Sequence, residues 1–381
     1  MYRYLYQHTE RYFGRLFEGA EPYGEQELRE LGATNVQQIH LGMHFDATRQ
    51  VLYDIVYRTR IFSRILAPLL RFPCRNEADV YNAARNFDWL DLFSLEHTFA
   101  IAANTGRSAI KNSKYAALKM KDGIVDRFRA TCKHRPNVDV RNPDILLNLY
   151  VHKDEACISL DLGGGSLHRR GYRTKSVDAP MRETLAATIL RIADWKGERP
   201  LYDPFCGSGT LLMEGYMRAA GIPAGYLRKH FGIFHLPDFC SELWHQTVEK
   251  TSLAISTPPP GLIAGSDLDP KAVSAARANA DLLPGGNAIE IHRSDFASLN
   301  GFDDAVILAN PPYGIRMGRR HEVARLLKEF GDFLKQRCSG STAYVFFGER
   351  DLAKKLGLKP GRKYPLHAGG LKGVLCRYEL Y

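Results

Sequence analysis

The chain has 381 residues, too many for one ordinary hydrophobic core, so its length predicts two or three domains. Hydrophobic residues make up 45% and charged residues 25%, as in a soluble globular protein, and no apolar run approaches the ~18–20 residues that a membrane helix needs. The formal net charge of +10 favours an acidic partner, either nucleic acid or an anionic membrane surface. The first residues, MYRYLYQHTERYFGRLF, carry charges throughout and do not resemble a secretory signal.

Cysteine and histidine spacing argues against disulfides and metal. The seven cysteines are scattered, odd in number and form no CxxC pair, so we expect reduced thiols in a cytoplasmic protein. His230, His235 and Cys240 are spaced five apart, which matches no usual zinc pattern, and we expect no metal site.

Positive charge is concentrated in one stretch of the chain. Between Thr105 and Arg135 there are nine Lys or Arg and two Asp, a net charge of +7. Within this stretch Ala117, Met120, Ile124 and Phe128 fall at helical spacing, which predicts a helix with most of its basic side chains on the other side. Clustered positive charge attracts a polyanion, most often nucleic acid.

Residues 1–162 have a mixed α and β pattern. The apolar residues predict a helix over Tyr53–Leu70, and HTFAIAANTG predicts a short strand before the basic stretch. DILLNLYVHKDEACISLDLGG predicts a hairpin with its turn at Lys153–Glu155. The glycine-rich, basic segment Gly163–Ser176 has no apolar periodicity and lacks the Lys-Ser/Thr ending of a phosphate-binding loop, so we interpret it as a linker.

From residue 177 onward, strands and helices alternate. Strands are predicted at Pro200–Asp203, Leu262–Asp267, Ile289–His292, Ala305–Ala309, Thr342–Phe347 and Gly373–Leu380, and helices at Arg182–Trp195, Thr210–Ala220, Pro270–Ala280 and Glu322–Arg337. This order predicts an α/β fold with a mostly parallel sheet covered on both faces. Ligands of such sheets bind beyond the carboxyl ends of the strands, so the residues that follow the strands form the candidate site.

The first of these strand ends carries a glycine turn. In YDPFCGSGTLLMEG a strand ends at Asp203, the GSG sequence turns the chain and a helix begins at Thr210. Glycines let a ligand approach the backbone, and the start of the helix favours an anionic group. Leu212 replaces the third glycine of a dinucleotide motif, and by itself this turn fits an ordinary strand–helix connection equally well.

Acidic residues follow the next two strands. Asp267 ends the second strand, where a carboxylate can accept hydrogen bonds from both hydroxyls of a ribose. Asp269 is placed to cap the helix that begins at Pro270. Asp295 and Phe296 follow the third strand, where an acid can accept from an amino group and an aromatic ring can cover a purine. Together, these strand ends predict a cofactor that contains adenosine, without a pyrophosphate loop.

The fourth strand end, in AVILANPPYGIRMG, combines hydrogen-bond acceptors with an aromatic ring. Asn310 follows the strand, and Pro311 and Pro312 fix the backbone and remove two amide donors. The Asn310 side-chain oxygen and the Pro311 carbonyl can therefore accept from an NH₂ group, and Tyr313 offers a face on which a planar ring can stack. A nucleobase with an amino group fits these features, and a simple proline turn is the alternative.

Longer stretches of the sequence resemble a known family. DPFCGSGT with NPPYG resembles the class I S-adenosylmethionine (SAM) methyltransferases that modify exocyclic amino groups. KNSKYAALKMKDGIVDRFR, the stretch from RPNVDV to HRRGYR, and APMRETLAATILR resemble the THUMP-domain RNA guanine-N2 methyltransferases, above all the N-terminal half of the RlmL family of 23S rRNA methyltransferases. The likeness covers nearly the whole chain. It implies a ferredoxin-like segment plus THUMP RNA-binding domain over residues 1–162, the linker over 163–176, and a Rossmann-like methyltransferase domain over 177–381.

The resemblance implies a role for each matching residue. The target base would be held by Asn310, Pro311, Pro312 and Tyr313. SAM would be bound at its methionine part by Asp203, Cys206, Gly207 and Gly209, at its ribose by Asp267, and at its adenine by Asp295 with Phe296. Phe205 and Thr210 would also bind the cofactor, and Glu183 and Thr184 would lie in a segment that flanks it. The implied reaction is methyl transfer to a guanosine N2 in 23S rRNA or a large-subunit precursor. No sequence feature signals a dimer, so we expect a monomer without membrane attachment.

Two departures from the family and several alternatives stay open. The family often has Glu after NPPYG, where this chain has Ile315. It also commonly carries a second methyltransferase domain, whereas this chain ends at Tyr381, so we expect any second modification to come from another polypeptide. The alternatives are a transfer RNA guanine-N2 methyltransferase, an adenine-N6 nucleic-acid or glutamine-amide methyltransferase, a non-catalytic RNA-binding assembly factor, and a nicotinamide oxidoreductase.

Overall fold

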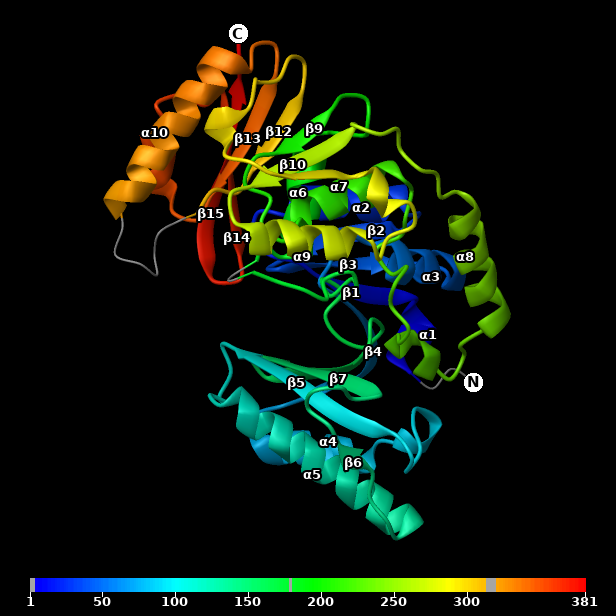
Figure 1. The fold of residues 1–381 in the computed structure, drawn as a ribbon. Helices are drawn as coiled ribbons and strands as arrows, with labels where there is room; N and C mark the ends of the chain where they lie inside the picture. The colour runs from blue at the N-terminus through cyan, green and yellow to red at the C-terminus, as the bar shows by residue number, and fades with distance from the viewer. Residues whose placement is uncertain (1–3, 178–179, 313–319) are drawn as a thin grey trace.

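The first half of the chain forms one mixed α and β region. The computed structural model describes residues 4–177, 180–312 and 320–381 (Figure 1). The helices of this half are α1 (Leu5–Thr9), α2 (Glu21–Glu30), α3 (Arg49–Arg58), α4 (Glu77–Asn86) and α5 (Ser113–Cys132). Its strands are β1 (Arg11–Arg15), β2 (Thr34–Ile39), β3 (Gly42–Asp46), β4 (Arg64–Pro73), β5 (Thr98–Gly106), β6 (Asn137–Val138), β7 (Ile145–His152) and β8 (Glu155–Asp161). They form a single sheet in the order β2-β3-β1-β4-β8-β7-β5-β6.

Strand β4 corrects one expectation. The helix predicted over Tyr53–Leu70 ends at Arg58, and the chain becomes strand from Arg64. β4 pairs with β1 through residues 64–66 and with β8 through residues 66–73, so Ile65 lies fully buried in the middle of the sheet. A strand with such neighbours has a nearly continuous apolar run, which periodicity alone does not distinguish from a buried helix. β4 therefore joins the part of the first sheet that contains β1 to the part that contains β8.

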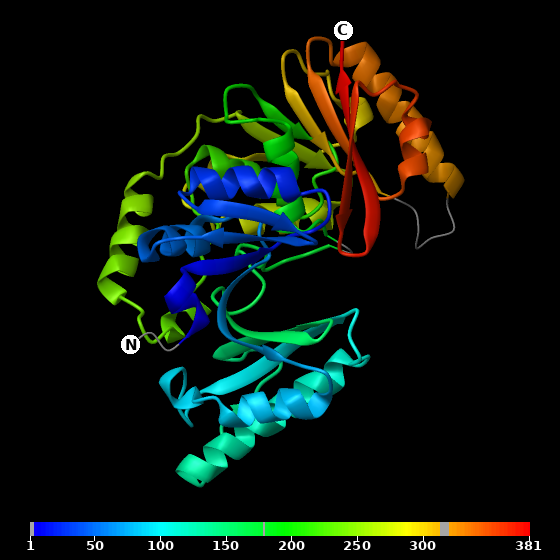
Figure 2. The ribbon, with the colours of Figure 1, turned by 180° about the vertical axis from the view of Figure 1, so that it is seen from behind.

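The basic stretch forms the predicted helix. α5 begins after Asn112, whose side chain accepts a hydrogen bond from the backbone N–H of Tyr115, and it buries Met120, Ile124 and Phe128. α4 and α5 lie on one face of β5 and β7, in the lower lobe of Figures 1 and 2. The predicted hairpin is also confirmed, since β7 and β8 pair antiparallel around a short turn.

The second half of the chain builds the other sheet. Its helices are α6 (Glu183–Ile192), α7 (Thr210–Ala219), α8 (Ser241–Leu253), α9 (Pro270–Ala280) and α10 (Arg320–Arg337), with the 3₁₀ turns η2 (Gly232–His235), η4 (Phe296–Ser298) and η5 (Arg350–Leu356). Its strands are β9 (Leu201–Asp203), β10 (Ile263–Asp267), β11 (Glu290–Arg293), β12 (Val306–Ala309), β13 (Thr342–Phe347), β14 (Arg362–Ala368) and β15 (Leu371–Glu379). In the order β11-β10-β9-β12-β13-β15-β14, the first five are parallel, and β15 runs antiparallel to both of its neighbours, β13 and β14. The predicted α/β fold is confirmed, while β14 was not predicted.

Both faces of the second sheet are buried. In β12, Val306 and Leu308 pack in the core formed with α6, α7 and α9, while Ile307 and Ala309 pack in a separate core formed with α10. The strand ends are therefore where this sheet can meet a ligand. Within the described ranges, no helix is both long enough and apolar enough to cross a bilayer.

Buried polar contacts anchor the segment between the two halves. Arg170, within the segment interpreted as a linker, is 1% exposed. Its Nε pairs with the Glu214 carboxylate of α7 at 3.2 Å, and its guanidinium donates to the carbonyls of Leu167 and Arg60. The Tyr172 hydroxyl donates to the same carboxylate at 3.1 Å. The segment thus packs against both halves, and its position as a domain boundary stays a prediction.

Candidate active site

The predicted site residues lie along one edge of the second sheet. Strands β11, β10, β9 and β12 are parallel neighbours, and the register places Asp203 of β9 beside Gly265 of β10. Residues that follow the carboxyl ends of parallel strands share an edge. The structure therefore brings together the strand ends that carry Asp203, Asp267, Asp295 and Asn310, as the sequence predicts.

The turn after β9 is compact. The backbone N–H of Phe205 donates to the Asp203 carboxylate at 3.0 Å, and the N–H of Gly209 donates to the carbonyl of Cys206 at 2.8 Å. Gly209 has φ +82°, and a Cβ at this position would lie 3.2 Å from the Cβ of Ala276 on α9. The turn therefore requires glycine here, both for its backbone conformation and for the close approach of α9.

Asp267 joins the end of β10 to this turn. One of its carboxylate oxygens accepts from the backbone N–H of Gly207 at 2.9 Å, and the other accepts from the N–H of Asp269, also at 2.9 Å. Asp269 in turn accepts from the N–H of Lys271 at 2.8 Å and caps α9, as predicted. Asp267 itself is half-buried, so its carboxylate is fixed by backbone groups while the residue still reaches the surface.

Burial controls the ionisation of two groups in the turn. Desolvation raises the pKa of Asp203 to about 8, and the charge of Asp267 adds to this rise, whereas the hydrogen bond from Phe205 opposes it. Burial also raises the pKa of the Cys206 thiol, so Cys206 is protonated near neutral pH and is not activated as a nucleophile. A carboxyl group held neutral in this way ionises more readily when a cation binds beside it.

Asp295 and Phe296 occupy different environments. Asp295 is exposed and caps η4, where its side chain accepts from the N–H of Ala297 at 3.0 Å. The ring of Phe296 is buried against Phe205 and Phe330, at centroid distances of 5.4 and 5.3 Å. The aromatic ring is therefore part of the core that packs between the sheet and α10. The predicted contacts of both residues with adenine stay predictions.

Arg173 connects Glu183 to the glycine turn and was not found from the sequence. Its guanidinium donates to the Thr210 hydroxyl at 2.7 Å and to the Met181 carbonyl at 2.8 Å, and it pairs with Glu183 Oε1 at 3.3 Å. Glu183 and Thr184 are both buried at the start of α6. Among the described residues, Glu183 Oε2 is buried without a hydrogen-bond partner, and burial raises the pKa of this carboxyl.

Asn279 is the second residue that sequence reasoning missed. It is fully buried on α9, and its Oδ1 accepts from the N–H groups of Thr174 and Lys175 at 3.1 and 3.2 Å. Its Nδ2 donates to the carbonyls of Lys175 and Ser208 at 2.9 and 3.1 Å. One amide side chain thus holds the 174–175 segment and the glycine turn together. An asparagine inside a helix is disfavoured unless its side chain has such partners, and that was the available signal.

The acceptor segment, Asn310–Tyr313, which is predicted to hold the target base, lies only partly within the described residues. Asn310 directly follows β12 and is half-buried, Pro311 is buried and Pro312 is exposed. β12 pairs with β9, so Asn310 emerges beside the strand that leads into the glycine turn. Tyr313 and Ile315 lie outside the described residues, and the stacking role of Tyr313 stays a prediction.

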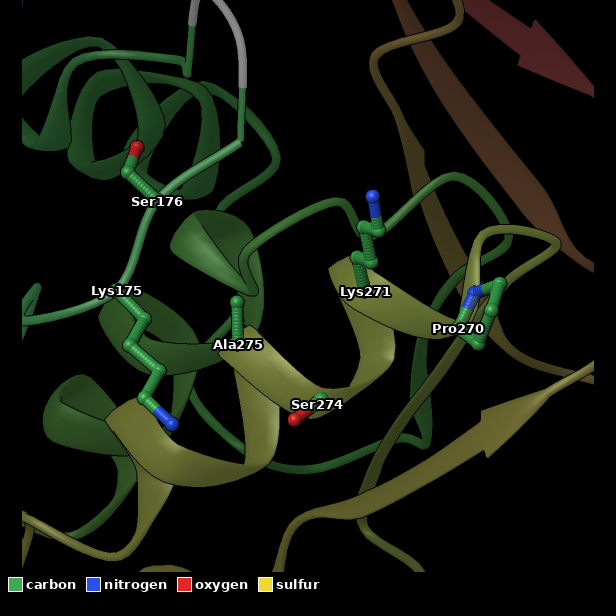
Figure 3. A pocket seen from close by; sticks show the side chains of 6 residues that line it. All are labelled: Lys175, Ser176, Pro270, Lys271, Ser274 and Ala275. Carbon is green, nitrogen blue, oxygen red and sulfur yellow. The ribbon is translucent and has the colours of Figure 1, made fainter.

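An open hollow of about 530 Å³ flanks this edge. Figure 3 shows its lining: Lys271 and Ser274 from the first turns of α9, and Lys175 with Ser176 from the segment opposite. Because none of the strand-end carboxylates lines it, this hollow is separate from the predicted cofactor site. Within the part of the chain that the structure describes, no three His, Cys, Asp or Glu side chains are grouped to hold a metal ion.

Comparison with known proteins assigns the family. The family model described as "RMKL-like, methyltransferase domain" matches residues 170–377, and the THUMP domain model matches residues 74–161. The chain belongs to the RMKL-like methyltransferase family. It is 37% identical, over 98% of this chain and 97% of the relative, to a Synechocystis sp. protein provisionally named an RNA methyltransferase. It is 36% identical to the ribosomal RNA large subunit methyltransferase K/L of Syntrophotalea carbinolica, over 97% of this chain but only 53% of that relative.

A solved structure shares the fold of this RMKL-like methyltransferase. A protein provisionally named a methyltransferase was crystallised with S-adenosylhomocysteine (SAH). It superposes with a TM-score of 0.84 at 24% identity, over 97% of this chain and 98% of that one. The predicted combination of a THUMP region and a Rossmann-like methyltransferase domain is confirmed. The cofactor of the family is SAM, as the sequence predicts.

The residues at the sheet edge fit SAM. This cofactor carries a sulfonium cation, an α-ammonium group and a ribose diol. The edge offers the carboxyl groups of Asp203 and Asp267, and the start of α6 offers that of Glu183. The Glu183 oxygen that lacks a partner among the described residues is a natural acceptor for an ammonium donor. A pyrophosphate would instead bring negative charge toward these acids, which disfavours the nicotinamide alternative.

Proposed function

We propose that this chain transfers the methyl group of SAM to the exocyclic N2 of a guanosine in 23S rRNA, free or within a large-subunit precursor. The observation that supports this most is the position of Asn310 and Pro311, which follow β12 beside the strand that carries Asp203 and the glycine turn. The methyl donor SAM and the target guanine would therefore meet between two neighbouring strand ends.

The acceptor segment would activate the amine by position and charge. The N2 of guanine is a weak nucleophile because its lone pair is delocalised into the ring. The Asn310 oxygen and the Pro311 carbonyl would accept hydrogen bonds from its two N–H groups, which orients the nitrogen and raises its electron density. Tyr313 would stack on the base after it flips out of the RNA. SAM supplies the electrophilic methyl group, and the displaced proton leaves after the transfer.

RNA binding would be the task of the first half of the chain. In this proposal residues 1–162, with the basic helix α5, hold RNA through phosphates and shape, residues 163–176 link the halves, and residues 177–381 carry out the reaction. The large-subunit substrate is supported by the names of the K/L relatives, about half of whose length this chain spans. The protein would act in the cytoplasm as a monomer.

A labelling experiment tests the proposed reaction. Labelled SAM is incubated with the protein and, separately, 23S rRNA, total transfer RNA or duplex DNA, and each product is digested to nucleosides. We expect N2-methylguanosine from 23S rRNA. The same nucleoside from transfer RNA alone would change the substrate. N6-methyladenosine from either RNA, or N6-methyl-2′-deoxyadenosine from the DNA, would contradict the assignment of N2.

The acceptor role of Asn310 is tested by Asn310→Ala. Loss of an acceptor aimed at the reacting amine should lower kcat by roughly 10²- to 10³-fold, as for other preorganised hydrogen-bond groups. The Kd of SAM, measured by calorimetry, should change by less than about twofold because the cofactor residues remain. Asn300→Ala, at an exposed asparagine before β12, is the matched control. Unchanged turnover in Asn310→Ala would contradict the assigned role.

A further inference from the structure

The first sheet has a face that, among the described residues, no helix covers. α4 and α5 pack on the opposite face, where Leu149 and Ile158 are fully buried in the core. Both Figure 1 and Figure 2 show α4 and α5 on the side away from the rest of the molecule, so the uncovered face of β5 and β7 is turned toward the second half. On this face Tyr150 is 48% exposed, although the preceding Leu149 is fully buried.

The strand register aligns four side chains across this face. Asn104 of β5 lies beside Tyr150 of β7, Tyr150 lies beside Cys157 of β8, and Cys157 lies beside Arg71 of β4. Residues directly opposite one another on neighbouring strands project to the same face. The row therefore places an amide, an aromatic ring and an exposed guanidinium on one surface.

A second ring lies parallel to Tyr150. His152 is two residues further along β7 and therefore on the same face, with the two ring centroids 6.1 Å apart and their planes within 6°. Beside His152 the register places Gly106 of β5, which has no side chain to cover the imidazole, and on the other side the exposed Glu155 of β8. Two parallel, partly exposed rings with a glycine beside them offer a surface onto which a flat group can stack.

The opening is confined to one end of the strands. At the other end η2 packs against the sheet, where the N–H of Ile233 donates to the Leu162 carbonyl at 2.9 Å. There the ring of His235 also contacts that of His97, with centroids 5.2 Å apart. The fold thus covers the end where β8 finishes and leaves the end near the β7–β8 turn open.

Charge indicates what occupies the open end. Arg71, Arg107 after β5 and Lys153 after β7 are all exposed here, against two acidic residues that follow Lys153 in the hairpin. The stretch Thr105–Arg135, with its net charge of +7, also begins at this end of β5, although its helix α5 lies on the opposite face. A polyanion with accessible flat rings matches this combination. Single-stranded RNA has such rings, whereas the base faces of a duplex are already stacked.

We propose that Tyr150 and His152 form a stacking platform for unpaired bases of single-stranded RNA, with Arg71 and Asn104 placed for a neighbouring phosphate and base edge. The proposal rests on the RNA substrate of the proposed function but concerns a surface distinct from the methyl-transfer site. Every base has a π-face, so stacking tolerates many sequences. The platform therefore holds a single-stranded segment near the target and leaves the choice of base to the active site.

Binding measurements on the full chain test this proposal. The Kd values of a fluorescent single-stranded RNA 12-mer and of the matching duplex are measured at several salt concentrations for wild type, Tyr150→Ala, Tyr150→Phe and Tyr115→Ala. Tyr115 is a similarly exposed tyrosine, 44% accessible, on the basic helix α5. We expect Tyr150→Ala to weaken binding of the single strand by roughly 5- to 150-fold, the range for loss of one stacked base. Duplex affinity and the salt dependence should not change, because no phosphate contact is removed.

The variants separate this proposal from its rivals. Tyr150→Phe should bind the single strand as wild type does, which also shows that the site stays folded. Tyr115→Ala, on the helix proposed to contact phosphates, should weaken binding of the single strand less than Tyr150→Ala does. An unchanged affinity in Tyr150→Ala, with a loss in Tyr115→Ala or in neither, would overturn the platform and leave the open face to a protein partner. If wild type methylates 23S rRNA but Tyr150→Ala binds normally, only the platform fails. If single strands bind through Tyr150 but no RNA is methylated, the platform stands and the proposed function fails.

Discussion

The two sheets of this protein bury different numbers of faces, and this difference determines where each can meet a ligand. In the second sheet, consecutive residues such as Val306 and Ile307 are both buried, each in a different core, so only the strand ends are accessible. In the β5–β8 part of the first sheet, Leu149 is buried and Tyr150 is exposed. A sheet covered on both faces can hold a compact ligand at its edge, whereas an open face can hold an extended one.

The largest loss of stability from a single substitution should come from breaking the buried ion pair between Arg170 and Glu214. Arg170→Ala leaves the Glu214 carboxylate buried without its ion-pair partner, and we expect the free energy of unfolding, measured in urea, to fall by about 3–5 kcal/mol. The double variant Arg170→Met with Glu214→Leu should recover much of this loss, because neither charge of the pair stays buried without the other. Equal losses in the single and double variants would show that the ion pair is not the cause.

A pH-dependent effect should follow from Asp203→Asn in the cofactor-free protein. The pKa of Asp203 is raised from 3.8 to about 8, so between these values the folded protein binds more protons than the unfolded chain. The free energy of unfolding therefore falls as pH rises through this window, by up to roughly 1.4 kcal/mol per pH unit, and levels off above it. Asparagine removes this loss. The Tm of the variant, measured by circular dichroism, should rise relative to wild type from pH 5 to pH 8, and parallel profiles would contradict the assignment.

A smaller effect is expected at the joint between the glycine turn and the 174–175 segment. Asn279→Ala removes four hydrogen bonds and leaves buried backbone groups unpaired, which should cost about 1–3 kcal/mol of stability. The variant loosens the glycine turn but keeps every residue predicted to contact SAM. The KM for SAM should therefore rise several-fold while kcat changes less. The exposed Asn287→Ala serves as the control. A loss confined to kcat would argue against a positioning role.

The sequence predicted the strand ends well because each candidate residue directly follows an apolar run. Asp203, Asp267 and Asn310 could be aligned along one edge from the order of strands and helices alone. Arg173 and Asn279 could not be found in this way. Their partners include Thr210, 37 residues from Arg173, and Lys175, 104 residues from Asn279, so their roles exist only in the folded chain.

Strands β4 and β14 escaped prediction for different physical reasons. β4 is apolar along much of its length because it lies between two neighbours, so its pattern resembled a continuation of α3. β14 is an edge strand that begins with Arg362 and contains Pro365. Charge and proline are common at edges, where they prevent pairing with other molecules, and they obscure the strand in the sequence. The open face was equally hidden, because only the structure shows which face of the sheet the helices cover.

The sharing of β4 affects how this protein can be divided. The THUMP match begins at residue 74, directly after β4 ends at Pro73. A fragment starting there would lose the strand that pairs with β8 over residues 66–73, and β8 would become an unprotected edge prone to aggregation. Any transplant of the RNA-binding module onto another enzyme must therefore carry β4. The smallest fragment that keeps this sheet intact is therefore longer than the sequence match to the THUMP domain, because it includes β4.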